Sequence, residues 1–162
     1  MLFLVVVFIA AFIFASFVEY WLHRWMHIDP RLGRDIIPHY EHHRENTANG
    51  VLLEFRDYAM VVPLSFLAFF ISIPVGISAA MGSLIYAAFS AYAHQLQHEC
   101  PTKCVWLKMP VHYVHHKYNQ WDCNFGLAVD WWDKLFGTYQ AMDWLTPEEL
   151  EKPTKGYLQI KW

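Results

Sequence analysis

The stretch that decides the fold is HYEHH, at residues 39–43, and the same pattern returns as HYVHH at residues 112–116. A histidine pair precedes each of them: HRWMH at residues 23–27 and HQLQH at residues 94–98. All ten histidines of the chain fall in these four motifs, so none is left over for an ordinary surface or core position. We therefore expect the histidines to act together.

The spacing within the motifs suits metal binding. Each pair stands at positions i and i+4, which lie one turn apart on the same face of an α-helix. Each triplet stands at i, i+3 and i+4, so it can supply one metal ion with two ligands and a neighbouring ion with the third. Neutral imidazole is a good ligand for iron, zinc, copper and nickel, and ten imidazoles suit two ions with five or six ligands each. The predicted ligands are His23, His27, His39, His42, His43, His94, His98, His112, His115 and His116.

The composition indicates that lipid surrounds part of the molecule. The 162 residues predict a single domain spanning 1–162. Apolar residues make up 56% of the chain and charged residues only 17%, against roughly 25% charged in ordinary globular proteins. A net charge of −3 and the lack of a basic stripe argue against a nucleic-acid partner. The three cysteines show no CxxC spacing and are expected to be reduced thiols facing the cytoplasm.

The first expected membrane span covers residues 1–22, in which Glu19 is the only charged residue. About twenty apolar residues in a helix match the roughly 30 Å thickness of the hydrocarbon core. A secretory signal peptide is the competing interpretation, but no basic residue precedes the apolar run. Glu19 stands four residues before His23, and a charge in a span needs a partner. We expect its carboxylate to accept the free ring N–H of the first histidine pair.

The second apolar region predicts a helical hairpin. No Lys, Arg, Asp or Glu occurs from residue 58 to residue 98, and one helix of that length would extend about 60 Å. Two spans, at about 58–74 and 77–95, with a turn at Ile73-Pro74-Val75-Gly76, solve this problem. A re-entrant pair of helices that enters the membrane without crossing it is the weaker alternative.

The basic residues predict the orientation in the membrane. All twelve Lys and Arg residues lie in segments 24–56 and 103–161. By the positive-inside rule both segments face the cytoplasm, so the histidine motifs, within 23–43 and 94–116, lie together on that face. The expected fold is an all-α integral membrane bundle of three or four embedded helices, with a cytoplasmic histidine-rich metal-binding cap completed by residues 117–162. Within that cap, Thr146 and the residues after it have the pattern of a helix start.

The four motifs, in this order, resemble those of the fatty acid hydroxylase/sterol desaturase superfamily, whose members are membrane-bound non-haem di-iron enzymes. NFG at residues 124–126 and WDKLFGTY at residues 132–139 are similar to the segment that follows the last histidine motif there. The resemblance covers roughly residues 19–139. It implies that the ten histidines bind the metals and that Asn124 and Asp133 support the site, with the chemistry carried out at the metal centre.

The resemblance also implies a reaction. The expected enzyme is an oxidoreductase that uses O2 to hydroxylate or desaturate a C–H bond of a lipid, such as a fatty acyl chain or a sterol. Two non-haem iron ions are the implied cofactors, with zinc as a substitute acquired during purification. Because the sequence is short, we expect no fused haem domain and expect electrons to come from a ferredoxin or small cytochrome with an NAD(P)H reductase. Homo-oligomerisation could complete the membrane-embedded roof.

Other functions fit the sequence less well. A carotenoid hydroxylase-like enzyme would suit the small size, but that branch usually has HxxxxH as its first motif and lacks the WDxLFGT segment. Haem-binding histidine pairs usually face each other from separate spans, and a metal transporter needs polar ligands at mid-membrane. A structural zinc site closes at four ligands, whereas this chain offers ten histidines.

Overall fold

The chain is all-helical in the computed structural model, which describes residues 1–152 and 155–162, and this confirms the predicted fold class. The elements, in chain order, are α1 (Leu2–Ile28), the π-helical turn η1 (Arg31–Ile36), α2 (His39–Glu45), α3 (Val51–Tyr58), the 3-10 helix η2 (Ala59–Phe70), α4 (Ile73–Glu99), the 3-10 turn η3 (Pro101–Lys103), α5 (Val111–Lys117), α6 (Trp131–Phe136) and α7 (Pro147–Glu151).

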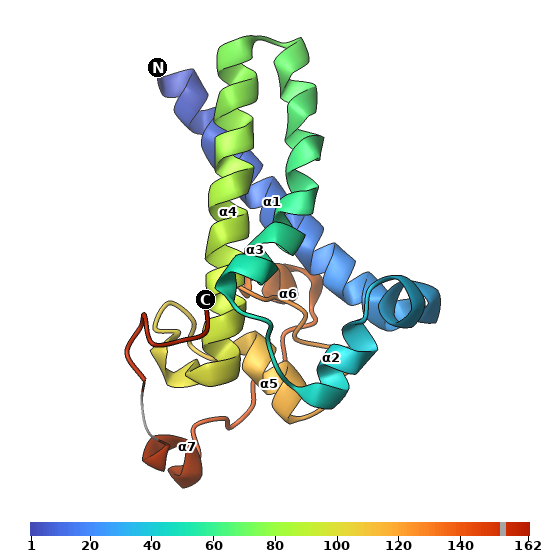
Figure 1. Cartoon of the computed structure of the whole chain (residues 1–162), viewed down its shortest axis with the longest axis vertical. Coiled ribbons are helices and arrows are strands. Elements are labelled where there is room, and N and C mark those ends of the chain that lie inside the picture. The colour runs from blue at the N-terminus through green and yellow to red at the C-terminus, as the bar shows by residue number, and fades with distance from the viewer. Residues whose placement is uncertain (153–154) are drawn as a thin grey trace.

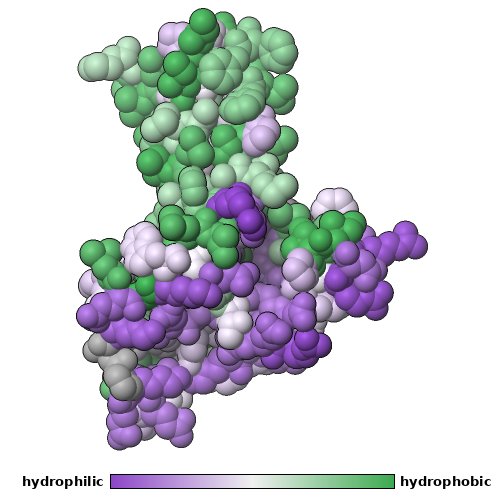
Figure 2. All heavy atoms as spheres, in the orientation of Figure 1, coloured by the Kyte–Doolittle hydropathy of each residue, from purple (hydrophilic) through white to green (hydrophobic). Residues whose placement is uncertain are grey.

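Two helices, α1 and α4, are long and apolar enough to cross a membrane. Each has 27 residues, which at 1.5 Å per residue is about 40 Å. Together with η2 they form a narrow stalk, while the shorter helices gather around the other end of α1 and α4 (Figure 1). On the face that Figure 2 shows, the stalk is mainly hydrophobic and the broader part is mainly hydrophilic. Lipid is the solvent that suits such a stalk, because large apolar side chains on it, such as Leu2 and Phe70, are exposed.

Small residues let α1 and α4 approach closely. A Cβ atom added to Gly82 on α4 would lie 2.3 Å from the carbonyl oxygen of Phe8 on α1. One turn earlier, the hydroxyl of Ser78 donates a hydrogen bond of 2.6 Å to the carbonyl oxygen of Leu4. Close backbone contact at small residues and hydroxyl hydrogen bonds between helices are typical of helix packing in membranes.

The hairpin is present, but its turn lies earlier than the sequence predicted. Helix α4 already begins at Ile73, and the chain reverses at Ile71 and Ser72. Ser72 is extended (φ −171°, ψ 161°) and its hydroxyl accepts a hydrogen bond from the N–H of Val75. Pro74 therefore occupies the first turn of the helix, where a missing N–H costs little. Proline here starts a helix, whereas the prediction used it to end one.

The span predicted at about 58–74 corresponds to η2, the arm of the hairpin that precedes α4 (Figure 1). It has 12 residues and contains Pro63, and at 2 Å per residue it is about 24 Å long. Three crossings remain a prediction, because only α1 and α4 among the described residues are candidate spans. The N-terminus and the hairpin turn lie at one end of the stalk, and the histidine-bearing helices α2 and α5 lie at the other (Figure 1).

In the C-terminal part, a helix begins at the predicted position. Helix α7 starts after Thr146, whose hydroxyl accepts a hydrogen bond of 3.3 Å from the N–H of Glu149. The three cysteines, Cys100, Cys104 and Cys123, are free thiols, and all of them are buried rather than facing solvent.

Candidate metal centre

Four helices bring the histidines together. The pairs lie at the ends of α1 and α4 away from the hairpin turn, and the triplets form most of α2 and α5. Helices α2 and α5 begin directly after Pro38 and Pro110. Because α1 and α4 pack along each other and the triplet helices follow them, all four motifs meet beneath the stalk.

Nine of the histidines form two groups in which the potential ligand atoms all lie within 4.8 Å of one another. The first histidine group consists of His23, His27, His39, His43 and His115. The second histidine group consists of His42, His98, His112 and His116. Each triplet is divided between the groups, so that His42 joins the second group while its neighbour His43 joins the first. The two halves of the sequence therefore interlock, and neither group can form from one half alone.

The tenth histidine, His94, borders the second group. Its Nε2 atom lies 3.2 Å from Nε2 of His42, and its ring centroid lies 4.5 Å from that of His112. His94 is the first member of the second pair, as His23 is of the first. With His94 included, the two groups would have five imidazoles each.

The distances between ring nitrogens fit metal ions. The Nε2 atoms of His27 and His39 lie 2.8 Å apart, those of His43 and His115 lie 3.1 Å apart, and those of His98 and His112 lie 3.2 Å apart. Two imidazole nitrogens bound at right angles to one ion, each about 2.1 Å from it, lie about 3 Å apart. Nε2 of His23 and Nε2 of His116 are buried and lack a hydrogen-bond partner among the residues that the structure describes. This donor set is one that a cation would satisfy.

Burial keeps the imidazoles of the triplets in the neutral form that binds metals. Burial, with the nearby ring of His94, lowers the pKa of His42 to about 4. Burial also lowers the pKa of His115 to about 4 and that of His116 further still. At neutral pH these rings are unprotonated and each has a free lone pair for a metal.

Backbone carbonyl groups set the orientation of three rings. Nδ1 of His23 donates to the carbonyl oxygen of Phe125 at 2.5 Å, and Nδ1 of His115 donates to that of Cys123 at 2.9 Å. Nδ1 of His42 donates to the carbonyl oxygen of Thr47 at 2.9 Å. A proton held on Nδ1 leaves the lone pair on Nε2, which is the arrangement usual for metal-binding histidines.

Asn124 and Asp133 hold the loop that carries two of these carbonyl groups. The buried carboxylate of Asp133 accepts hydrogen bonds from the N–H of Phe125 at 2.8 Å and of Gly126 at 2.7 Å. Asn124, with a left-handed backbone (φ 58°), exchanges hydrogen bonds of 2.9 Å with the backbone of Gln140. Among the described residues, neither side chain has a hydrogen bond with a histidine; both fix the backbone that orients His23 and His115.

Glu19 lies elsewhere than the sequence predicted. Its carboxylate accepts hydrogen bonds from the hydroxyls of Tyr86 and Ser90 on α4 and from the N–H of Leu127 at 3.2 Å. Among the described residues it has no hydrogen bond with a histidine. The imidazole of His23 uses the Phe125 carbonyl instead, so Glu19 ties α1 to α4 and to the 124–127 loop.

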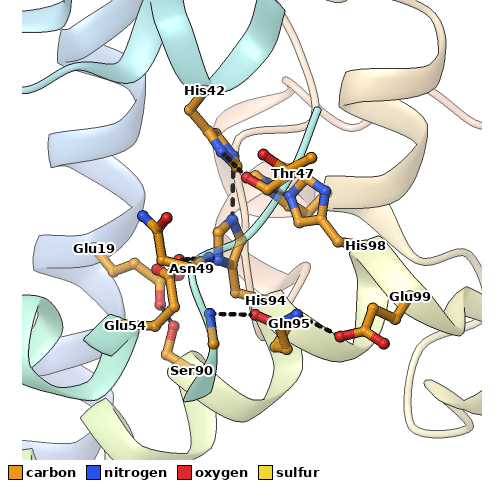
Figure 3. A network of polar contacts seen from close by, with 12 residues as sticks. Glu19, His42, Thr47, Asn49, Glu54, Ser90, His94, Gln95, His98 and Glu99 are labelled. Carbon is orange, nitrogen blue, oxygen red and sulfur yellow. Dashed lines mark hydrogen bonds and ion pairs between the residues drawn. The ribbon is translucent and has the colours of Figure 1, made fainter. Parts of the chain in front are cut away.

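Glu54 on α3 is a site residue that the sequence did not reveal. Its Oε2 atom lies 3.2 Å from Nδ1 of His94, and its Oε1 atom accepts a hydrogen bond of 3.0 Å from the N–H of Asn49 (Figure 3). Although burial raises the pKa of Glu54, the contacts with His94 and Asn49 outweigh it and lower that pKa to about 2. A carboxylate at this distance would hold a proton on Nδ1 and leave Nε2 of His94 free.

The sequence patterns also did not reveal a role for the two glutamines inside HQLQH. The side chain of Gln97 accepts a hydrogen bond of 2.9 Å from the N–H of His112 and donates one to the carbonyl oxygen of Leu127. The side chain of Gln95 accepts a hydrogen bond of 2.8 Å from the N–H of Gly50. Both glutamines are almost fully buried. Two uncharged polar residues at the end of an apolar span were the available signal.

A cavity of about 230 Å³ lies between α1, α3, the start of η2 and α4, directly beside the histidines. His23, His39, His42, His94 and His112 form part of its wall. Apolar side chains from α1, from the link between η1 and α2, and from α4 form much of the rest, together with the carboxylates of Glu19, Glu54 and Asp57. No Lys or Arg is among the lining residues.

The aromatic lining of this cavity consists of Tyr58 and Tyr86. One exposed aromatic side chain, that of Trp121, instead stacks on the ring of His43 with a centroid distance of 5.3 Å. Trp121 therefore covers the first histidine group from the side of the solvent.

Comparison with known proteins accords with this site. The family model described as fatty acid hydroxylase matches residues 8–138. The chain is similar to a dihydroceramide fatty acyl 2-hydroxylase of Arabidopsis thaliana, with 26% identity over 132 residues, which cover 76% of this chain and 56% of the relative. The chain thus spans little more than half of that relative's length. No solved structure matches. The matched region contains all four histidine motifs, and the chain belongs to the fatty acid hydroxylase family.

Proposed function

We propose that this chain is a membrane-bound lipid hydroxylase that contains two non-haem iron ions and uses O2 and external electrons. One observation carries the proposal: two histidine groups lie next to each other, in the wall of a cavity, at the end of an apolar stalk. The family and the hydroxylase relative support the type of reaction. The apolar helices α1 and α4 support a location in the membrane, where lipid substrates are present.

The protein side chains would hold and orient the metals. We assign one ion to the first histidine group and one to the second group together with His94. When bound, the iron ions supply the activation of O2 that attack on a C–H bond requires. Imidazole ligands leave the ions cationic, and the carbonyl groups of Phe125, Cys123 and Thr47 keep the ring protons on Nδ1. Asn124 and Asp133 would act through the loop that carries the first two of these carbonyl groups.

The cavity favours an acyl group attached to an uncharged headgroup. The polar side chains in its wall include the acceptors Glu19, Glu54 and Asp57, without a Lys or Arg that could bind a carboxylate. These carboxylates would disfavour the carboxylate of a free fatty acid beside them, whereas amide N–H and hydroxyl groups could donate hydrogen bonds to them. The relative's name describes action on the fatty acyl group of dihydroceramide. We infer an acyl amide or a similar neutral lipid as the substrate class.

Electrons would come from a separate protein. Suitable electron donors are ferredoxins, which are iron–sulfur proteins, or small cytochromes, in either case reduced by an NAD(P)H reductase. We place the histidine motifs on the cytoplasmic face, because the basic residues lie in the same part of the chain. Trp121 is exposed to solvent and stacks on His43 of the first histidine group. We therefore propose that the electron donor approaches from the side of Trp121.

The test is a measurement of metal content followed by a turnover assay. Protein purified in mild detergent and reconstituted anaerobically with ferrous iron should contain about two iron ions per chain, the number that the histidine groups suggest. Addition of an N-acyl lipid, a chemical reductant and isotope-labelled O2 should then place one labelled oxygen atom in the acyl chain. A desaturated acyl chain without labelled oxygen would show that the enzyme desaturates its substrate and does not hydroxylate it. One tightly bound zinc ion with no uptake of iron would contradict the proposal.

A further inference from the structure

The C-terminal strap, residues 155–162, crosses the region where α3 begins and α4 ends. Ile160 is 5% exposed and packs in a core with Val51 of α3 and Leu96 of α4. The hydroxyl of Tyr92 donates a hydrogen bond of 3.0 Å to the carbonyl oxygen of Tyr157. The strap lies outside residues 8–138, which match the family.

Backbone hydrogen bonds join the strap to both helices. The N–H of Val51, at the start of α3, donates a hydrogen bond of 3.1 Å to the carbonyl oxygen of Lys161. The N–H of Lys161 donates one of 2.8 Å to Oε1 of Glu99, the last residue of α4. The ammonium group of Lys155 binds the other carboxylate oxygen of Glu99. One residue of the strap, Lys161, therefore links the start of α3 with the end of α4.

Gly50 allows this close approach. Its backbone has a φ of +109°, and a Cβ atom there would lie 2.9 Å from the carbonyl oxygen of Trp162. The N–H of Gly50 donates a hydrogen bond to the side chain of Gln95, whose amide group in turn donates one of 2.6 Å to Glu99 (Figure 3). The strap, the start of α3 and the last turn of α4 thus form one connected hydrogen-bond network.

The same short helix α3 carries the carboxylate that orients His94. Glu54 lies one turn after Gly50, and its Oε2 atom lies 3.2 Å from Nδ1 of His94. His94 stands next to Gln95 on α4 and lies 3.2 Å, between Nε2 atoms, from His42 of the second histidine group. A shift of α3 along α4 would therefore change the distance between Glu54 and His94.

We propose that the C-terminal strap is a positioning element for the second histidine group: it fixes α3 against α4 and thereby holds Glu54 on His94. This inference rests on the metal site of the proposed function, but it concerns metal affinity and not the lipid reaction. Ile160 and Lys161 act through Glu54 and are positioning residues. Loss of an outer partner of a metal ligand typically weakens metal binding about 10- to 100-fold.

The experiment is a titration of the full-length protein in detergent with cobalt(II), whose d–d absorption reports the ligand geometry of each bound ion. Ile160→Ala should weaken the binding of one of two cobalt ions about tenfold or more, as Glu54→Gln should. Leu158→Ala is the matched control, because this side chain of the strap is 73% exposed; it should bind both ions as the wild type does. Ile160→Val should restore most of the affinity.

The double variant Ile160→Ala/Glu54→Gln separates positioning from a general loss of stability. If the strap acts through Glu54, the two changes together should cost little more than Glu54→Gln alone. Additive losses, or an unchanged affinity in Ile160→Ala, would overturn the proposal. Equal weakening of both cobalt ions would also overturn it. Failure of the proposed function would look different: two ions would bind in a strap-dependent manner, yet no lipid would be oxidised.

Discussion

Nδ1 of His23 on α1 lies 2.5 Å from the carbonyl oxygen of Phe125, although the two residues are 102 positions apart. The N–H of Gly126, which belongs to the same peptide group as that carbonyl, donates a hydrogen bond of 2.7 Å to Asp133. The Asp133 carboxylate thus reaches the first histidine group through one peptide unit. This connection explains how the segment after the last histidine motif supports the site.

Asp133→Ala should lower both stability and metal content. The change would leave the buried N–H groups of Phe125 and Gly126 and the hydroxyl of Thr138 without their acceptor. Because each unsatisfied buried donor costs about 1–3 kcal/mol, we expect at least about 2 kcal/mol of destabilisation. Thermal unfolding in detergent and metal content per chain are the measurements.

Asp130→Asn is the control for Asp133. Asp130 precedes α6, and its ion pair, of 2.6 Å, is with the half-exposed Lys134. Such a pair contributes about 0–1 kcal/mol, so the variant should resemble the wild type. Equal losses in the two variants would mean that α6, and not the Asp133 hydrogen bonds, supports the site.

His42→Ala and His43→Ala should remove different metal ions, although the residues are neighbours. His43 lies in the first histidine group and His42 in the second. Each variant should lose about one of two bound ions, since each removes a ligand from only one group. Cobalt(II) spectra should change differently in the two variants. Loss of the same ion in both would contradict the division of the triplet.

Ala87→Phe should block the cavity and leave the metals in place. Ala87 is 2% exposed and lines the cavity beside the histidines. A ring there would displace the substrate by more than 1 Å, so kcat/KM should fall at least about tenfold. The neighbouring Ala88 is exposed, so Ala88→Phe should keep the wild-type kcat/KM. Metal content, measured in both variants, should be unchanged; a fall confined to Ala87→Phe would mean that the ring disturbs the metal site.

Gly82→Ala should destabilise the contact between α1 and α4. The added methyl group would lie 2.3 Å from the carbonyl oxygen of Phe8, so the helix backbones must move apart. Overpacking of this kind costs about 1–3 kcal/mol. Unfolding by denaturant in detergent measures the change, and Met81→Ala, at an exposed position on the same helix, is the control. A Gly82→Ala variant as stable as the wild type would show that the helices separate without cost.

The local patterns of the sequence predicted the helices well. The i, i+4 pairs lie on α1 and α4, and the triplets form α2 and α5 directly after their prolines. Helical periodicity acts within a few residues, and apolar length is a local property too. The family resemblance likewise depended on motifs that can be read along the chain, and it also singled out Asn124 and Asp133.

What only the tertiary structure decided was the choice of partners across long separations. The sequence shows a carboxylate four residues before His23, but Glu19 binds Tyr86, Ser90 and Leu127, while Glu54 on another helix reaches His94. His42 joins a group that otherwise comes from the second half of the sequence, and His115 joins one that otherwise comes from the first half. This division follows from the way α2 and α5 face each other. The sequence by itself determined which histidines share a helix, because spacing along one helix sets which side chains share a face. Packing between helices determined which carboxylate meets which ring, because such contacts depend on the positions of whole helices and leave no local pattern.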